Sequence, residues 1–191
     1  MSAAPLHERL VFDSAGGAVL DGDRRYVLLR ADVLMGLFAQ LDGAARERAL
    51  ESLRASVHAH GAGSVRAYRD AVGAEALPSM MESAAASLGW GRWRIDSGRL
   101  HDRPPSLALA VENSPFAAHA PSGTPRACHA IAGMLEALGD ALWSRPASAR
   151  ETRCAAAGAA DCRFVVAPRD AEPAVPEPPP ARRLSRPGDR S

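Results

Sequence analysis

The spacing of three cysteines and one glutamate constrains the fold of this chain more than any other feature of its sequence. Cys128 stands in the run Thr-Pro-Arg-Ala-Cys-His-Ala-Ile, and Glu151, Cys154 and Cys162 follow together further along the chain. Thiolates with one carboxylate form a suitable donor set for a tetrahedral zinc ion. We therefore expect one metal ion to hold two separate segments of the chain against each other.

The local spacing of these ligands predicts the shape of the segment that carries them. Glu151 and Cys154 would point to opposite faces of an ideal strand, so a bend is expected between them. Gly158 can supply the reversal that returns Cys162 to the same point. Four protein ligands leave no open coordination position, which indicates a structural metal site. Nearby arginines would offset its negative charge: Arg126, Arg150, Arg153 and Arg163.

Two other interpretations of the same residues stay open from spacing alone. The cysteines could be buried as small hydrophobic residues, with Glu151 an ordinary surface side chain. His129 could also replace Glu151 as the fourth ligand, although simultaneous binding with its neighbour Cys128 would be strained.

The composition describes a globular protein of one main domain. The chain has 191 residues, 47% hydrophobic and 24% charged, with a net charge of +1, so charge alone gives no reason to expect nucleic-acid binding. It contains no lysine, which excludes Schiff-base catalysis and a P-loop. No segment approaches the roughly 20 apolar residues of a membrane span. An odd cysteine count without a secretory signal favours the cytoplasm.

The hydrophobic periodicity predicts an α+β fold, an antiparallel sheet with helices packed on it. Strands are expected within residues 10–30, at 90–95 and 107–113, and in a closing hairpin of 148–154 and 162–167. Helices are expected over 32–41, 44–60, 64–71, 75–88 and 127–143, with a break at glycines 61 and 63 and a surface loop over 114–125. A domain over 8–168 would lie between a flexible N-terminus, 1–7, and a disordered Pro/Arg-rich tail, 169–191.

Four segments resemble the 4-vinyl-reductase (4VR) domain family. They are Val111-Glu-Asn-Ser-Pro-Phe-Ala, Cys128-His-Ala-Ile-Ala-Gly-Met-Leu, Glu151-Thr-Arg-Cys and Gly158-Ala-Ala-Asp-Cys-Arg-Phe. Residues 10–13 and 22–30 are also similar to the start of the aromatic-sensing domains of phenol- and xylene-responsive transcription activators. The resemblance implies an α/β ligand-binding sandwich, shared with haem–nitric-oxide-binding domains and a vesicle-tethering subunit. It also implies a structural zinc held by the ligands Cys128, Glu151, Cys154 and Cys162.

A domain of this kind would hold an apolar or aromatic small molecule in a buried pocket with few polar anchors. The candidate lining residues, each of which could equally belong to the core, are Met80, Met81, Trp90, Trp93, Phe116 and Trp143. Phe116 and His119 lie in the loop that would cover the pocket. Phenol sensors carry a histidine on the helix before the central strands, where this chain has Met80 and Met81. The resemblance therefore implies a more apolar or larger ligand than phenol.

Three functions are compatible with the sequence. The first is a sensory domain that binds a small molecule and acts through a homodimer or a signalling partner. The second is a 4-vinyl reductase, or its accessory protein, acting on a tetrapyrrole in bacteriochlorophyll synthesis. The third is an adaptor or assembly protein without a small ligand. The sequence shows no paired nucleophile and base, no haem motif and no Gly-x-Gly-x-x-Gly fingerprint, which favours a non-enzymatic function.

Overall fold

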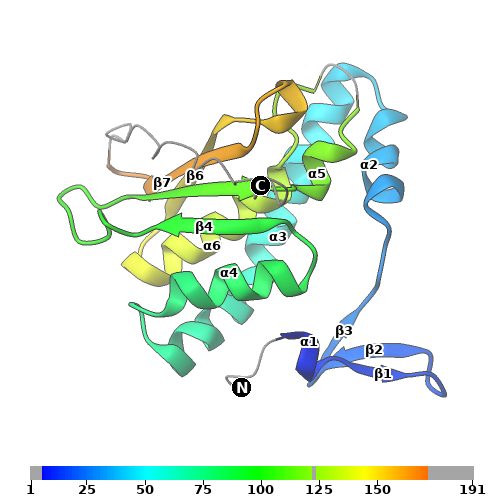
Figure 1. Ribbon diagram of the computed structural model, residues 1–191, viewed down its shortest axis with the longest axis horizontal. Helices are drawn as coiled ribbons and strands as arrows, with labels where there is room; N and C mark the ends of the chain where they lie inside the picture. The colour runs from blue at the N-terminus through cyan, green and yellow to red at the C-terminus, as the bar shows by residue number, and fades with distance from the viewer. Residues whose placement is uncertain (1–5, 122–123, 172–191) are drawn as a thin grey trace, which may run out of the picture.

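The N-terminal segment forms a small sheet beside the main body of the protein. The computed structural model describes residues 6–121 and 124–171. Helix α1 (Leu6–Arg9) precedes three short antiparallel strands, β1 (Val11–Asp13), β2 (Ala18–Asp21) and β3 (Arg24–Tyr26), in the order β1-β2-β3. An extended stretch, residues 27–30, then leads to α2 (Ala31–Ala39) (Figure 1). The strands expected within residues 10–30 are therefore present.

Helix α3 (Gly43–Val72) is one continuous helix of 30 residues, so the expected break at Gly61 and Gly63 is wrong. Asp42 caps its first turn by accepting a hydrogen bond from the backbone N–H of Ala45. A Cβ built on Gly61 would approach Met134 Cε to 2.9 Å, so this glycine leaves space for a side chain of the neighbouring helix α6. Packing against α6 offsets the cost of a helical glycine, about 1 kcal/mol.

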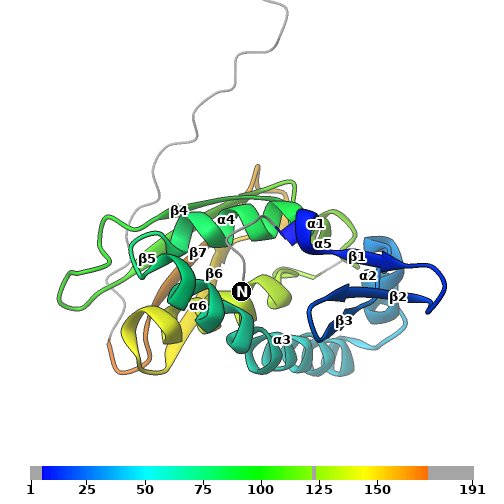
Figure 2. The ribbon, with the colours of Figure 1, turned by 90° about the horizontal axis from the view of Figure 1, so that it is seen from below.

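The main sheet has four antiparallel strands in the order β4-β5-β7-β6. They are β4 (Arg92–Asp96), β5 (Leu107–Glu112), β6 (Ala147–Arg153) and β7 (Cys162–Pro168). Helix α6 (His129–Trp143) packs on β6 and β7, α4 (Leu77–Ser87) packs on β4, and α3 packs on α6 from outside. Figures 1 and 2 show α3 and α6 on the same side of the sheet. This arrangement confirms the predicted α+β fold.

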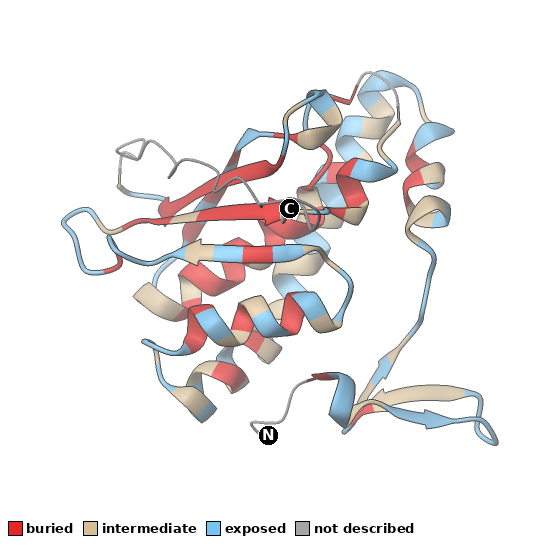
Figure 3. Cartoon of the chain, viewed as in Figure 1, coloured by how far each residue is buried: buried red, intermediate tan, exposed pale blue. Residues whose placement is uncertain are grey.

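The core lies between this sheet and α6. Every residue of β7 is buried, as are Ile131, Leu135 and Leu138 of α6 (Figure 3). The loop expected over residues 114–125 contains a short helix, α5 (Pro115–Ala118), and is not wholly on the surface, because Phe116 is 5% exposed. No helix in the described ranges has the length and apolar content that a membrane crossing requires.

The last described residues continue from β7 along the body. The backbone N–H of Arg169 donates to the carbonyl of Pro146, and its guanidinium donates to the carbonyl of Ala147. The first residue of the expected tail is therefore bonded to the body. Residues 172–191, the rest of that segment, lie outside the described residues.

Candidate functional site

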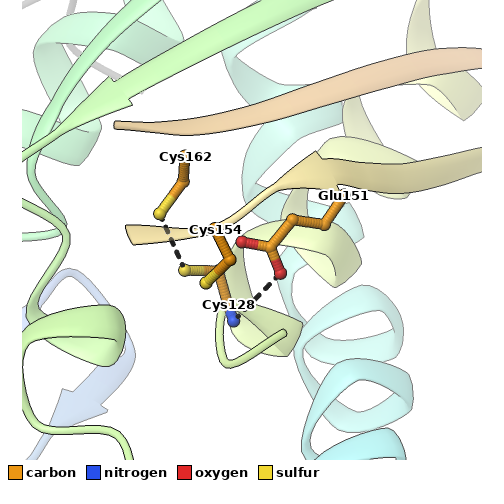
Figure 4. A group of neighbouring side chains, drawn as sticks. All are labelled: Cys128, Glu151, Cys154 and Cys162. Atoms are coloured by element: carbon orange, nitrogen blue, oxygen red, sulfur yellow. Dashed lines mark hydrogen bonds between the residues drawn. The ribbon is translucent and has the colours of Figure 1, made fainter. Parts of the chain in front are cut away.

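The three cysteines and Glu151 meet at one end of the β6–β7 hairpin (Figure 4). Cys128 is the residue before α6, Glu151 lies on β6, Cys154 follows that strand, and Cys162 is the first residue of β7. All four side chains are buried, and one potential ligand atom from each lies within 4.8 Å of the others. The sequence pattern therefore identified a group that the fold does bring together.

A bulge in β6 turns Glu151 and Cys154 toward the same point. The register with β7 shifts between Glu151 and Arg153, so Thr152 is an extra residue on β6. A single 3-10 turn, η1 (Ala155–Ala157), follows, and Gly158 ends it with a φ of +88°. This left-handed conformation suits glycine and returns the chain to Cys162. The bend expected from the ligand spacing is confirmed.

The geometry of the group fits a tetrahedral metal ion. Zinc–sulfur bonds of about 2.3 Å would separate two thiolates by about 3.8 Å. The Sγ atoms of Cys128 and Cys162 lie 3.5 Å apart. Within the described residues, Glu151 Oε1 is buried without a hydrogen-bond partner, while Oε2 accepts from the Cys128 backbone N–H at 3.4 Å. An unsatisfied buried carboxylate oxygen is costly, and a bound cation would satisfy it.

His129 is not part of the group. Its Nδ1 lies 3.4 Å from Glu51 Oε2 on α3. Among the described residues, the group that could hold a metal contains Glu151 and the three cysteines, so the arrangement favours Glu151 as the fourth ligand.

Burial raises the proton affinity of the group when no cation is present. It lifts the pKa of Glu151 to about 8, and a hydrogen bond with Cys154 adds to the effect. Hydrogen bonds with Cys154 and Cys162, together with burial, hold the pKa of Cys128 well above its usual range. A divalent cation would reverse this preference and favour the charged forms.

The four nearby arginines have different surroundings. Arg163 forms a buried ion pair with Asp161, Nη2 to Oδ2 at 2.8 Å. The other three are exposed: Arg126, Arg150 and Arg153. Any effect of these three on the charge of the cluster therefore acts through solvent and is strongly screened.

Two further groups contact the cysteine sulfurs and were not expected from the sequence. Ser114 Oγ lies 3.3 Å from Cys128 Sγ, and the backbone N–H of Ala155 donates to Cys162 Sγ at 3.3 Å. Ser114 also caps α5, with Pro115 in the first turn. Serine followed by proline is a signal for a helix start and could have indicated this turn. Such contacts orient metal ligands.

Arg54 connects the helices to the hairpin that carries the cluster. From α3 it donates to Glu136 of α6, with Nη2–Oε1 at 2.7 Å and Nε–Oε2 at 3.1 Å, and to the carbonyl of Ala149 on β6 at 3.0 Å. Glu136 is only 6% exposed. This contact fixes α6, which begins beside Cys128, relative to β6, which carries Glu151.

An open cleft of ≈ 550 Å³ lies next to the cluster, between α3, α6 and β6. Its lining includes Cys128 and Glu151, together with arginines of α3 and β6. Since charged side chains make up much of its wall, this cleft is not the apolar pocket that the sequence led us to expect.

The predicted apolar lining residues fall into two separate places. The rings of Trp90 and Phe116 meet edge to face, with centroids 5.3 Å apart, and Trp93 Nε1–H donates to the Trp90 carbonyl at 3.2 Å. Met81 of α4 is buried with them in the core, and Met80 packs against it. Trp143 lies apart, at the far end of α6, where its Nε1–H donates to the Leu100 carbonyl at 3.4 Å.

Comparison with known families places this architecture. Residues 107–168 match the family model of the 4-vinyl-reductase (4VR) domain. The chain carries a 4VR domain. A comparison with curated protein sequences finds no match. The resemblance to the 4VR family expected from the sequence motifs is therefore confirmed.

Two solved structures share the fold of this 4VR chain. The phenol-responsive sensory domain of the transcription activator PoxR, with phenol, aligns with a TM-score of 0.70 and 20% identity over 85% of this chain and 86% of that one. A vinyl-4-reductase family protein from Methanocaldococcus jannaschii aligns with a TM-score of 0.50 and 16% identity over 75% and 83%. At these identities the likeness shows the fold.

The 4VR match covers only part of the two candidate sites. Residues 107–168 include all four candidate metal ligands and Phe116. Met81, Trp90 and Trp93 precede the match, on α4 and around β4. The aromatic cluster is therefore built where the 4VR domain meets the segment before it.

Proposed function

We propose that this protein is a sensory domain of the 4VR type, which binds an apolar or aromatic small molecule and is stabilised by a structural zinc ion. The observation that carries the proposal is the fold shared with the PoxR sensory domain, whose structure includes phenol, over 85% of this chain. A buried aromatic cluster offers the same chain a surface suited to such a ligand. We place the protein in the cytoplasm, where thiols remain reduced.

The ligand would lie against Trp90, Trp93 and Phe116, with Met80 and Met81 completing the apolar wall. Edge-to-face rings offer both an apolar face and a polarised edge to an aromatic guest. Methionine side chains adapt to ligands of different shape. Because Trp143 contacts Leu100 far from this cluster, our proposed pocket does not include it.

Titration with small molecules tests the ligand proposal. We would titrate the protein with phenol, toluene, indole and naphthalene and follow tryptophan fluorescence and heat. We expect saturable binding of at least one compound, and replacing Phe116 with leucine should weaken it roughly 10-fold, since one aromatic contact is lost. Trp143→Phe is the matched control and should leave the affinity unchanged. A folded protein that binds none of the four would refute the proposal and favour an adaptor.

The zinc ion would be held by Cys128, Glu151, Cys154 and Cys162 and would fix the start of α6 to the β6–β7 hairpin. Four protein ligands close the coordination sphere, so the role is structural. Metal analysis of Cys154→Ser tests this, with Ser114→Ala as the control that touches Cys128 without being a ligand. We expect the first to lose bound zinc and melt at a lower temperature, and the second to keep its metal. Unchanged zinc content and melting temperature in Cys154→Ser would refute the site.

A 4-vinyl reductase, or an accessory protein acting on a tetrapyrrole, is the second candidate function. The fold shared with the vinyl-4-reductase family protein from Methanocaldococcus jannaschii supports it. Incubation with a divinyl tetrapyrrole and an added reductant tests it. Reduction of the vinyl group that is lost in Phe116→Leu would favour this function over sensing.

A further inference from the structure

The N-terminal part of the protein exposes an apolar surface that its own fold does not cover. It is formed by Val11, Phe12, Val27, Leu28, Leu29, Val33 and Leu37, which we call the N-terminal apolar surface. These residues are between 53% and 81% exposed, and Val27 and Leu28 are the most exposed at 81% and 70% (Figure 3). In the described residues only one other large hydrophobic side chain, Leu88, is exposed, and its exposed fraction is 37%.

The small sheet that carries part of this surface has little core of its own. Its strands are 3 or 4 residues long, and every residue of β1 is exposed. Short sheets of this kind need a packed apolar face to be stable. A polar cluster joins the sheet to the body: Arg9 of α1 donates to Asp21 of β2 at 2.8 Å and to Tyr68 Oη of α3 at 3.1 Å. The exposed apolar side chains take no part in this cluster and are left for another partner.

The size of the surface fits a protein interface. At the measured exposures, seven side chains of this kind present on the order of 700 Å². A standard interface buries about 800 Å² on each partner. Covering the surface with a second protein molecule would therefore suffice for a stable complex.

The charges around the surface favour a second copy of the same chain. Arg25 and Arg30 are matched by Asp23 and Asp32, so both signs occur within one short segment. A patch with both signs can pair with itself across a two-fold axis, where each Arg meets an Asp of the other copy. Nucleic acid or an anionic membrane would instead call for a patch of one sign.

We propose that a second copy of this chain packs on the N-terminal apolar surface and forms a two-fold symmetric homodimer. The exposed edge of β1 and the extended residues 27–30 lie at the centre of the interface. It uses none of the candidate metal ligands or proposed ligand-contacting residues, so dimerisation and ligand binding can fail independently of each other.

Sedimentation equilibrium of the full chain tests the proposal. The wild type should sediment at twice the monomer mass of 20.1 kDa at micromolar concentration. Leu28→Glu should raise the dimer dissociation constant at least about 100-fold, because a symmetric interface contains each substitution twice. Leu88→Glu, at an exposed leucine that ends α4 outside the surface, is the matched control and should remain dimeric.

Leu37→Glu on α2 is a second variant should Leu28→Glu fail to fold, and circular dichroism shows whether each variant is folded. A wild type that stays at 20.1 kDa overturns the proposal, as does a folded Leu28→Glu that dimerises with unchanged affinity. Binding of the monomer to anionic lipid vesicles would also overturn it and assign the surface to a membrane.

Discussion

Replacing Gly133 with alanine should disturb the contact on which the metal cluster depends. Gly133 lies in α6 where that helix crosses α3, and a Cβ built there would come within 2.2 Å of the backbone oxygen of Arg54 and 3.1 Å of its carbonyl carbon. Since these are backbone atoms, no change of rotamer can relieve the overlap. The two helices must move apart, and the Arg54–Glu136 contact moves with them.

Two opposing terms set the magnitude. Alanine is a better helix former than glycine by about 1 kcal/mol. Overpacking costs about 1–3 kcal/mol, and a backbone overlap takes the upper end of that range. We therefore expect Gly133→Ala to lower the free energy of unfolding by about 2 kcal/mol and the melting temperature by roughly 4–8 °C.

Gly63→Ala in α3 is the matched control, because a Cβ there meets nothing within 4 Å. It should gain about 0.5–1 kcal/mol from helix propensity alone. Urea denaturation of both variants, at equal metal content, measures the difference. If Gly133→Ala were as stable as the wild type, or if both variants shifted in the same direction, the close approach of α3 and α6 would be refuted.

Two further perturbations have expected outcomes. Arg54→Met should destabilise the protein by about 3 kcal/mol in urea denaturation, because it leaves the Glu136 carboxylate buried without its main partner; a change below about 1 kcal/mol would contradict the clamp. The hydrogen bond from Arg9 holds the pKa of Asp21 below its usual value, so its contribution is present above about pH 4 and is lost as the pH falls through the lowered pKa. Asp21→Asn should therefore flatten the acid side of the stability profile, and an unchanged profile would argue against the pair.

The sequence predicted the parts of the structure that local patterns determine. Alternation around Trp93 indicated β4, and the odd spacing of Glu151 and Cys154 indicated a bend that the structure realises as a bulge. Ligand identity follows from side-chain chemistry, so the metal cluster could be named before the fold was known.

The remaining features depend on contacts between distant segments. Gly61 and Gly63 are local breakers, yet α3 continues through them because α6 packs along it. The Arg54–Glu136 contact joins residues 82 positions apart, and no local pattern marks it. The placement of Trp143 away from Trp90 likewise follows from the packing of α6 and not from its composition.

The position of β7 has a consequence for the synthesis of this protein. It is the last strand of the described chain, yet it lies between β5 and β6 in the sheet. A growing chain on the ribosome can pair neither β5 nor β6 with β7 until residues 162–168 emerge, and until then their apolar residues lack that partner strand. Cys162, a candidate metal ligand, begins the same strand. The sheet and the metal centre are thus completed by the same 7 residues, and a chain that stops before them lacks both.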